Sequence, residues 1–485
     1  MRTGAFWIVS LALAASNSAT MDSIMVQPEY QPTTPAPKGL NRAEAQHETA
    51  KHLVQLIAID TQNPPGNELK VAQYLDATLS AVPGIETHVL ELSPGRANFV
   101  ARLHAMRPEK KAVLLMAHSD VVGVDRAKWE SPPFEATLRD GYLYGRGAID
   151  DKGMLAAELT ALLSLAKQRD GLDRDLILLA TAGEESGGEG IEWLLNHDFR
   201  EIEDAEFAIN EGGRIRLENG RLLLVNIQTT EKIPYNVLAR ANGPSGHGSI
   251  PLPNNALAAL ARAVAKVHQW RPPVRLNETT RSYFSGLARI EKDSALKQAM
   301  AQVSTSQDSI AIDRSAEILS HEPRYNAMLR TGVSVTLIQG GIRSNVIPSE
   351  ATATFNVRLL PGENIHELVR EMSRVAGESQ VTFSVSGESR PSAPASSEST
   401  ALYAALEEAA ETMAPGVVVT PFMSPGGTDG AVLRAKGIAT YGILPLPLTV
   451  DDELRMHGDN ERVPVGSLGW AAEYLYRMLL LVASR

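Results

Sequence analysis

Apolar and polar positions follow two patterns along the first 230 or so residues. Segments 43–59, 68–82 and 153–168 carry apolar residues at helical spacing, which predicts three α-helices. Short apolar runs between them predict buried β-strands. These runs are 97–103, 111–118, 175–183 and 205–210. Strands that alternate with helices predict an α/β fold with a layered, largely parallel sheet.

From about residue 232 the order of elements changes. Strand, helix, strand, strand, helix and strand follow one another, which is the ferredoxin-like order. The segments concerned are 235–243, 254–270, 332–341, 350–360, 364–377 and 381–388. The polar, weakly periodic range 271–330 interrupts this unit and is interpreted as an insertion. The α/β pattern then resumes, so we expect an outer domain in two segments, 42–231 and 390–485, around an inserted domain, 232–389.

The N-terminus has the pattern of a secretory signal peptide. One arginine precedes an apolar run from Gly4 to Ala15, and small residues follow. The run is shorter than the ~20 residues that a membrane span needs. We therefore expect a signal peptide over 1–19, a Pro-rich linker over 20–41, and export to the periplasm or the medium. An uncleaved anchor or a disordered tail is the alternative.

Composition narrows the chemistry. The formal net charge of −11 argues against a nucleic-acid or anionic-membrane partner, because phosphate groups are bound by basic surfaces. Cysteine is absent, which excludes disulfides, thiolate nucleophiles and sulfur ligands. Any metal ion must therefore be held by His, Asp or Glu.

Acidic residues and one histidine lie at the ends of three predicted strands: His118 and Asp120, Glu184 and Glu185, and Glu211. Two more acidic residues, Asp150 and Asp151, lie in a Gly-containing stretch just before the helix predicted near Gly153. Each group alone also fits a His–Asp pair without metal, an acidic helix start or a solvated acidic rim. The carboxyl ends of parallel strands meet at one sheet edge, however, and carboxylates gathered there repel one another unless a cation lies among them. The grouping therefore predicts a cation site. His457, in a polar loop far downstream, would by itself be taken as an exposed side chain.

Five stretches, "HSDVV", "GRGAIDDKG", "GEESGGEG", "NEGG" and "MHGDNE", occur in this order. Together they resemble the M20 family of zinc peptidases and aminoacylases, and the resemblance runs from about residue 43 to the C-terminus. It implies a zinc-peptidase-like α/β/α sandwich as catalytic domain, with the inserted ferredoxin-like α+β domain as a lid and dimerisation domain.

The resemblance also implies two Zn²⁺ ions per subunit, with Co²⁺ or Mn²⁺ as substitutes. Asp150 would bridge the ions. His118 and Glu211 would complete the ligands of one ion, and Glu185 and His457 those of the other.

Further roles follow from matching positions. Glu184 would be the general base and Asp120 the partner that orients His118. A cis peptide often follows the bridging aspartate in this family, here between Asp150 and Asp151.

Residues outside the metal cluster match family positions as well. His247 would stabilise the oxyanion, reaching across a homodimer to the active site of the partner subunit. Asn345 and Arg358 would bind a substrate carboxylate, and the backbone of Gly426 and Gly427 would contact the substrate. Without the resemblance, these residues fit a Gly-rich turn, a surface strand and an ordinary tight turn.

We therefore expect a di-zinc amidohydrolase that cleaves a small peptide or an N-acyl amino acid, as a carboxypeptidase, dipeptidase or aminoacylase. No membrane association is expected after removal of the signal peptide. The alternative is a binding or regulatory protein of the same fold without catalysis. A serine hydrolase is disfavoured because the chain lacks a G-x-S-x-G elbow, and the H-E-x-x-H zinc helix is also missing.

Overall fold

A ten-stranded mixed sheet forms the centre of the computed structural model, which describes residues 32, 34–387 and 390–484. The expected signal peptide and most of the expected linker lie outside these residues. The strands are, in spatial order, β1 (Ile85–Ser93), β2 (Arg96–Leu103), β6 (Leu176–Thr181), β3 (Ala112–His118), β7 (Ala205–Asn210), β17 (Ala439–Gly442), β9 (Arg221–Glu231), β8 (Arg214–Glu218) and β18 (Pro447–Leu448), with β16 (Val418–Ser424) paired to β9. β3 pairs in parallel with both β6 and β7.

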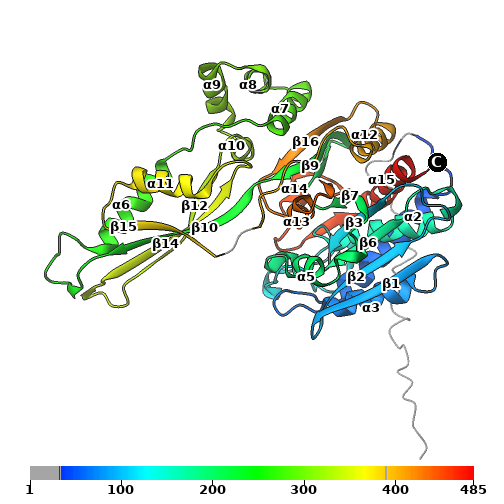
Figure 1. Cartoon of the computed structure of the whole chain (residues 1–485), viewed down its shortest axis with the longest axis horizontal. Coiled ribbons are helices and arrows are strands. Elements are labelled where there is room, and N and C mark those ends of the chain that lie inside the picture. The colour runs from blue at the N-terminus through cyan, green and yellow to red at the C-terminus, as the bar shows by residue number, and fades with distance from the viewer. Residues whose placement is uncertain (1–31, 33, 388–389, 485) are drawn as a thin grey trace, which may run out of the picture.

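Helices cover both faces of this sheet (Figure 1). One layer consists of α2 (Arg42–Ala58), α3 (Glu68–Leu79), α4 (Lys152–Ala166), α12 (Ala401–Met413) and α15 (Val465–Ala483). The other contains α5 (Glu189–His197) and α13 (Gly430–Ala435). Alternation along β3 explains both layers, because Val113 and Leu115 belong to one hydrophobic core and Leu114 and Met116 to the other. The predicted α/β/α sandwich is confirmed.

A separate four-stranded antiparallel sheet is built from the middle of the chain. Its order is β12 (Gly332–Gly340), β14 (Glu350–Leu359), β10 (Ile233–Asn242) and β15 (Val381–Ser386). Helices α6 (Ala256–Gln269) and α11 (Ile365–Ala376) pack on it through a hydrophobic core of its own. This is the ferredoxin-like arrangement that the order of elements predicted, and we call it the lid (Figure 1).

The polar range 271–330 folds into four α-helices. They are α7 (Glu278–Ile290), α8 (Ser294–Thr305), α9 (Ser309–Leu319) and α10 (Pro323–Leu329). Their apolar faces form one hydrophobic cluster with Leu224 of β9 and with Val418 and Met423 of β16. The helices of 271–330 therefore pack against the edge of the central sheet, although the sequence places them within the lid.

A three-stranded sheet joins the first segment of the outer domain to the second. Its strands are β4 (Thr137–Arg139), β5 (Tyr142–Tyr144) and β19 (Arg462–Pro464), and β19 pairs with β5 through Arg462 opposite Tyr144. This pairing brings the segment after α14 (Val450–Glu453) beside the loop that precedes α4. Within the described residues, no helix combines the length and apolar character needed to cross a bilayer.

Candidate active site

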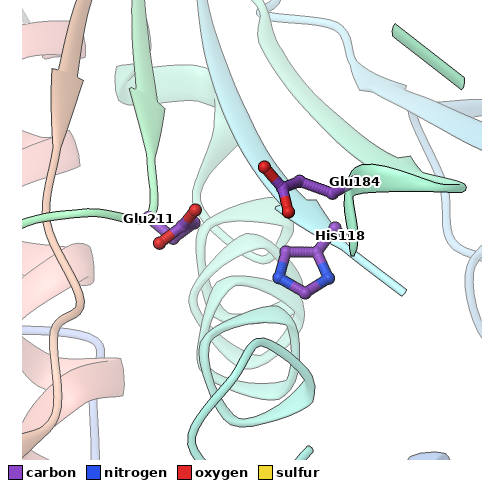
Figure 2. A group of neighbouring side chains, drawn as sticks. All are labelled: His118, Glu184 and Glu211. Carbon is purple, nitrogen blue, oxygen red and sulfur yellow. The ribbon is translucent and has the colours of Figure 1, made fainter. Parts of the chain in front are cut away.

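Three neighbouring parallel strands supply the centre of the site. His118 is the last residue of β3, Glu184 and Glu185 follow β6 in a short 3₁₀ turn, and Glu211 directly follows β7. Because β3 lies between β6 and β7, the carboxyl ends of the three strands meet at one point. Figure 2 shows His118, Glu184 and Glu211 pointing into a shared space.

Asp150 lies between two histidines. Its Oδ1 is 2.8 Å from Nε2 of His118, and its Oδ2 is 3.0 Å from Nε2 of His457. The same Nε2 of His457 lies 2.9 Å from Oε1 of Glu185. The C-terminal segment thus contributes a histidine to a cluster whose other members come from the first half of the chain. The peptide between Asp150 and Asp151 is cis, as the resemblance implied.

The donor set fits a metal centre. Ligand atoms of His118, Asp150 and Glu185, and likewise those of His118, Glu184 and Glu211, all lie within 4.8 Å of one another. The Nδ1 of His118 faces the backbone carbonyl of Asp120 at 3.0 Å. If the neutral imidazole of His118 donates its Nδ1–H to this carbonyl, its Nε2 carries a lone pair that faces the lone pair of Asp150 Oδ1. Two such lone pairs repel one another unless a proton or a metal cation lies between them.

Electrostatics also favour a cation. Burial and the neighbouring Asp150 carboxylate raise the pKa of Glu211 to about 7. Hydrogen bonds to Asp150 and Glu185 raise the pKa of His457 to about 10. Both shifts show that the clustered carboxylates are stabilised by a nearby positive charge, and a divalent ion bound among them would supply that charge.

Asp120 orients its neighbours. Its Oδ1 accepts the backbone N–H of Glu184 at 3.1 Å, and its Oδ2 accepts the backbone N–H of Glu185 at 3.2 Å. Its Oδ1 also lies 3.5 Å from Nδ1 of His118. One buried carboxylate thus fixes both the histidine and the turn that carries the two glutamates.

Three residues of the site were given no role by the sequence. Arg390 Nη2 donates to Oε1 of Glu184 at 2.7 Å, and its Nη1 lies 3.5 Å from the buried Asp429. Glu461 accepts the backbone N–H of Ile149 at 2.7 Å and that of Asp150 at 3.2 Å. Glu461 lies inside the quoted motif "MHGDNE", and Asp429 lies two residues after Gly427, a predicted substrate contact; these positions were the available signal. Arg390 lies in none of the five motifs.

The predicted substrate-binding residues fall into two groups. Arg358, Gly426 and Gly427 line a cavity of about 1010 Å³ together with Asp150, Glu184, Glu185, Glu211 and His457. His247 and Asn345 do not line it. Both are exposed at the end of the lid distant from the central sheet, where His247 pairs with Val346 and Gly248 N donates to Asn345 O at 2.8 Å.

Comparison with known proteins identifies the family. The model of peptidase family M20/M25/M40 matches residues 114–481. The chain belongs to this family. The human N-fatty-acyl-amino acid synthase/hydrolase is 27% identical over 467 residues, which cover 93% of this chain and 91% of that protein. A probable carboxypeptidase S-like protein of Dictyostelium discoideum is 28% identical over 376 residues, 76% of this chain and 71% of that protein.

A solved M20 family metallo-carboxypeptidase from Sulfolobus solfataricus has the same fold, with a TM-score of 0.66 at 20% identity, covering 90% of this chain and 99% of that one. As an M20 family member, this chain is a hydrolase of amide bonds.

Proposed function

We propose that the protein is a co-catalytic di-zinc amidohydrolase that cleaves an N-acyl amino acid or a small peptide, with Glu184 as general base. The observation that carries the proposal is the position of Asp150 between His118 and His457, with Glu184 facing the same space. Histidine and carboxylate ligands without cysteine suit zinc, with Co²⁺ or Mn²⁺ as substitutes. His118, Asp150 and Glu211 would hold one ion, and Asp150, Glu185 and His457 the other.

Zinc ions bound here would supply a water of lowered pKa and positive charge for the substrate carbonyl oxygen. Glu184 accepts the proton of the attacking water and passes it to the leaving amine nitrogen. Burial raises the pKa of Glu184, while the guanidinium of Arg390 opposes this. A raised pKa makes the carboxylate a stronger proton acceptor, and Arg390 holds it in place.

Arg358 supports the inference that the substrate carries a carboxylate. Its Nε donates to Asn356 Oδ1 at 3.0 Å, and among the described residues no carboxylate forms an ion pair with it. Burial and the nearby Arg390 lower the pKa of Arg358, so an anion bound here would relieve both effects. We infer that Arg358 binds the carboxylate that an amino-acid product carries, as arginine does in bidentate pairs. The backbone of Gly426 and Gly427 would contact the same substrate.

Turnover and metal content test this function together. We expect Glu184→Gln to lower kcat by about 10²–10⁴-fold on N-acyl amino acids and dipeptides, with bound zinc unchanged. Glu189→Gln, an exposed glutamate on the same segment, is the matched control and should retain activity. Full activity of Glu184→Gln would contradict the proposed base. A wild-type protein that binds zinc but cleaves no amide would favour the alternative, a binding protein of this fold.

We further propose a homodimer formed through the lid. β12 is an edge strand, and Leu337 and Ile338 on it are 55% and 60% exposed, while Ile342 beyond it is 95% exposed. Such an apolar edge is typical of an interface. A second copy there would supply His247 to the active site across the dimer, with Asn345 beside it.

Sedimentation and kinetics test the dimer. We expect Ile338→Glu to yield monomers with low kcat, and His247→Ala to remain dimeric with low kcat. A wild-type protein that sediments as a fully active monomer would refute this role of His247.

We also propose export. The support is the signal-peptide pattern of residues 1–19. N-terminal sequencing of the mature protein from the native cell would identify cleavage near Ala19, and an intact N-terminus would contradict it.

A further inference from the structure

The active-site cavity has a second basic part, which β8 supplies. Arg214 and Arg216 of this strand both line the cavity and are half-buried. Ile215 and Leu217 alternate with them and are buried in the hydrophobic core of the outer domain. Because side chains two positions apart on a strand share a face, β8 directs two guanidinium groups toward the cavity, with their backbones about 7 Å apart.

The arginines of β8 lie across the metal centre from Arg358. Arg358 is close enough to Arg390 to be repelled by it, and Arg390 donates to Glu184 after β6. Glu211, three residues before Arg214, lies on the side of the site opposite Glu184 (Figure 2). In the order of the sheet, β8 lies beyond β7 as seen from β6. A substrate with its scissile carbonyl at the metal centre therefore has arginines on both sides.

Neither arginine of β8 has a carboxylate partner within residues 32, 34–387 and 390–484. Arg214 donates to the backbone carbonyl of Gly213 at 2.7 Å and to Sδ of Met456 at 3.5 Å. Arg216 forms neither a hydrogen bond nor an ion pair with the residues of these ranges. A guanidinium group that is partly withdrawn from water without a counter-ion is stabilised when an anion binds beside it.

The acidic residues around this part of the cavity have partners of their own. Glu453 Oε2 lies 3.3 Å from Nη1 of Arg324, and Glu322 Oε1 accepts the backbone N–H of Arg324 at 3.4 Å. Glu218, the next residue on the same face of β8, lies 3.5 Å from Nζ of Lys292. Outside the metal ligands, three arginines and two glutamates line this part of the cavity, so a net positive charge remains there.

Asn226 adds a hydrogen-bond donor beside the arginines. It lies on β9 directly opposite Arg214, is 8% exposed and lines the same cavity. Its Oδ1 accepts the hydroxyl of Thr420 at 2.9 Å, which leaves the N–H groups of the amide to donate to a ligand. Two guanidinium groups and an amide donor suit a carboxylate, which arginine binds through two parallel N–H···O bonds.

We propose that Arg214 and Arg216 form a second anion subsite, which binds a carboxylate on the acyl side of the scissile amide. This inference rests on the proposed amidohydrolase function, in which Arg358 holds the carboxylate of the amino-acid product. The substrate then carries a negative charge at both ends. It is either an amino acid acylated by a dicarboxylic acid or a dipeptide that begins with an acidic residue.

The two arginines bind the substrate and take no part in proton transfer. The reaction remains hydrolysis, in which water adds across the C–N bond. One product is a dicarboxylic acid or an acidic amino acid, and the other is the free amino acid released from the Arg358 side.

Matched substrate pairs test the charge alone. The N-glutaryl and N-pentanoyl derivatives of one amino acid, chosen from a screen of N-acetyl compounds, differ only in the terminal carboxylate, and N-adipoyl and N-hexanoyl derivatives extend the chain by one carbon. Glu-X and Gln-X dipeptides place the carboxylate at the glutaryl distance, so the two arms distinguish the two sources. Charge-assisted hydrogen bonds should make kcat/KM about 10–100-fold higher for the acidic member in at least one arm.

Variants of β8 test the assignment to these residues. Arg216→Gln should lower the acidic-to-neutral ratio of kcat/KM at least tenfold, and Arg216→Lys, which keeps the charge without the bidentate geometry, should retain part of it. Arg221→Gln is the matched control, because Arg221 is an exposed arginine on β9 outside the cavity, and it should keep the ratio of the wild type. A wild-type ratio near one in both arms, or a ratio unchanged by Arg216→Gln, would overturn the subsite.

Binding separates this inference from the proposed function. Calorimetry on Glu184→Gln should show that the N-glutaryl compound binds more tightly than the N-pentanoyl compound, and that adding Arg216→Gln removes the difference. Amide hydrolysis without any preference for the acidic substrates would overturn the subsite while the hydrolase stands. Absence of hydrolysis of every compound, with binding of the N-glutaryl compound that depends on Arg216, would refute the proposed function and leave an anion-binding site.

Discussion

The buried pair of Arg146 and Glu461 offers a sharp test of how the bridging aspartate is held. Glu461 Oε1 accepts the backbone N–H groups of Ile149 and Asp150, and Oε2 accepts Gly147 N at 3.0 Å and Arg146 Nη1 at 2.7 Å. Both side chains are about 2% exposed or less. All four donors around the carboxylate therefore depend on its two oxygens.

The perturbation is Glu461→Gln, which keeps the shape of the side chain. Its amide nitrogen cannot accept a hydrogen bond, so two of the four bonds are lost whichever way the amide is turned. The change also leaves Arg146 as an unpaired buried charge, a loss of about 3–5 kcal/mol when one partner of such a pair is removed. That is a large share of a net stability of about 5–15 kcal/mol.

Metal binding should weaken together with stability. Glu461 supports the backbone of Asp150, and loss of such outer partners lowers metal affinity by about 10–100-fold. The assays are urea unfolding followed by tryptophan fluorescence and zinc competition with a chromophoric chelator.

Glu473→Gln is the matched control. Glu473 on α15 is a buried carboxylate that pairs with Arg42 and Arg477, and its other contacts do not include the metal cluster. We expect a similar loss of stability with zinc affinity unchanged. The reasoning fails if Glu461→Gln unfolds within about 1 kcal/mol of the wild type, or if it binds zinc as tightly as Glu473→Gln.

Three further outcomes are expected. Burial lowers the pKa of His52 to about 4, so between about pH 6.5 and 4 the unfolded chain binds a proton at this residue and the folded chain does not. The free energy of unfolding should therefore fall by about 3 kcal/mol as the pH drops through this window. Acid unfolding of a His52→Phe variant should lack this pH dependence. In calorimetry, a chelator should lower the thermal unfolding midpoint and added zinc should restore it, because the metal binds only the folded chain. At a free zinc concentration of 100 times Kd, the gain in the free energy of unfolding is about 2.7 kcal/mol. An unchanged midpoint would argue against the metal centre. Gly286→Ala should lower the free energy of unfolding by about 1–3 kcal/mol, because the new Cβ would clash with Cγ2 of Thr420. Adding Thr420→Ser, which removes Cγ2 but keeps the hydroxyl, should recover most of this loss in the same calorimetric assay.

Local patterns were sufficient for most of the fold. Apolar runs such as 111–118 and helical spacing such as 153–168 correspond to β3 and α4, because buried strands and helices differ in period and length. The order of elements in the lid predicted its sheet. The range 271–330 was harder, since four short helices with many polar residues give a weak periodic signal although their apolar faces pack together.

The sequence by itself determined the chemistry of this protein: no sulfur ligands, carboxylates and a histidine after parallel strands, and five motifs in a family order. Tertiary structure decided which groups meet. His457 reaches Asp150 because β19 pairs with β5, and Arg390 reaches Glu184 across 206 positions of sequence. Leu296 of α8 lines the same cavity because α8 packs on α7, and α7 in turn packs on β16. Contacts between distant segments depend on how whole surfaces pack, and no local spacing records that.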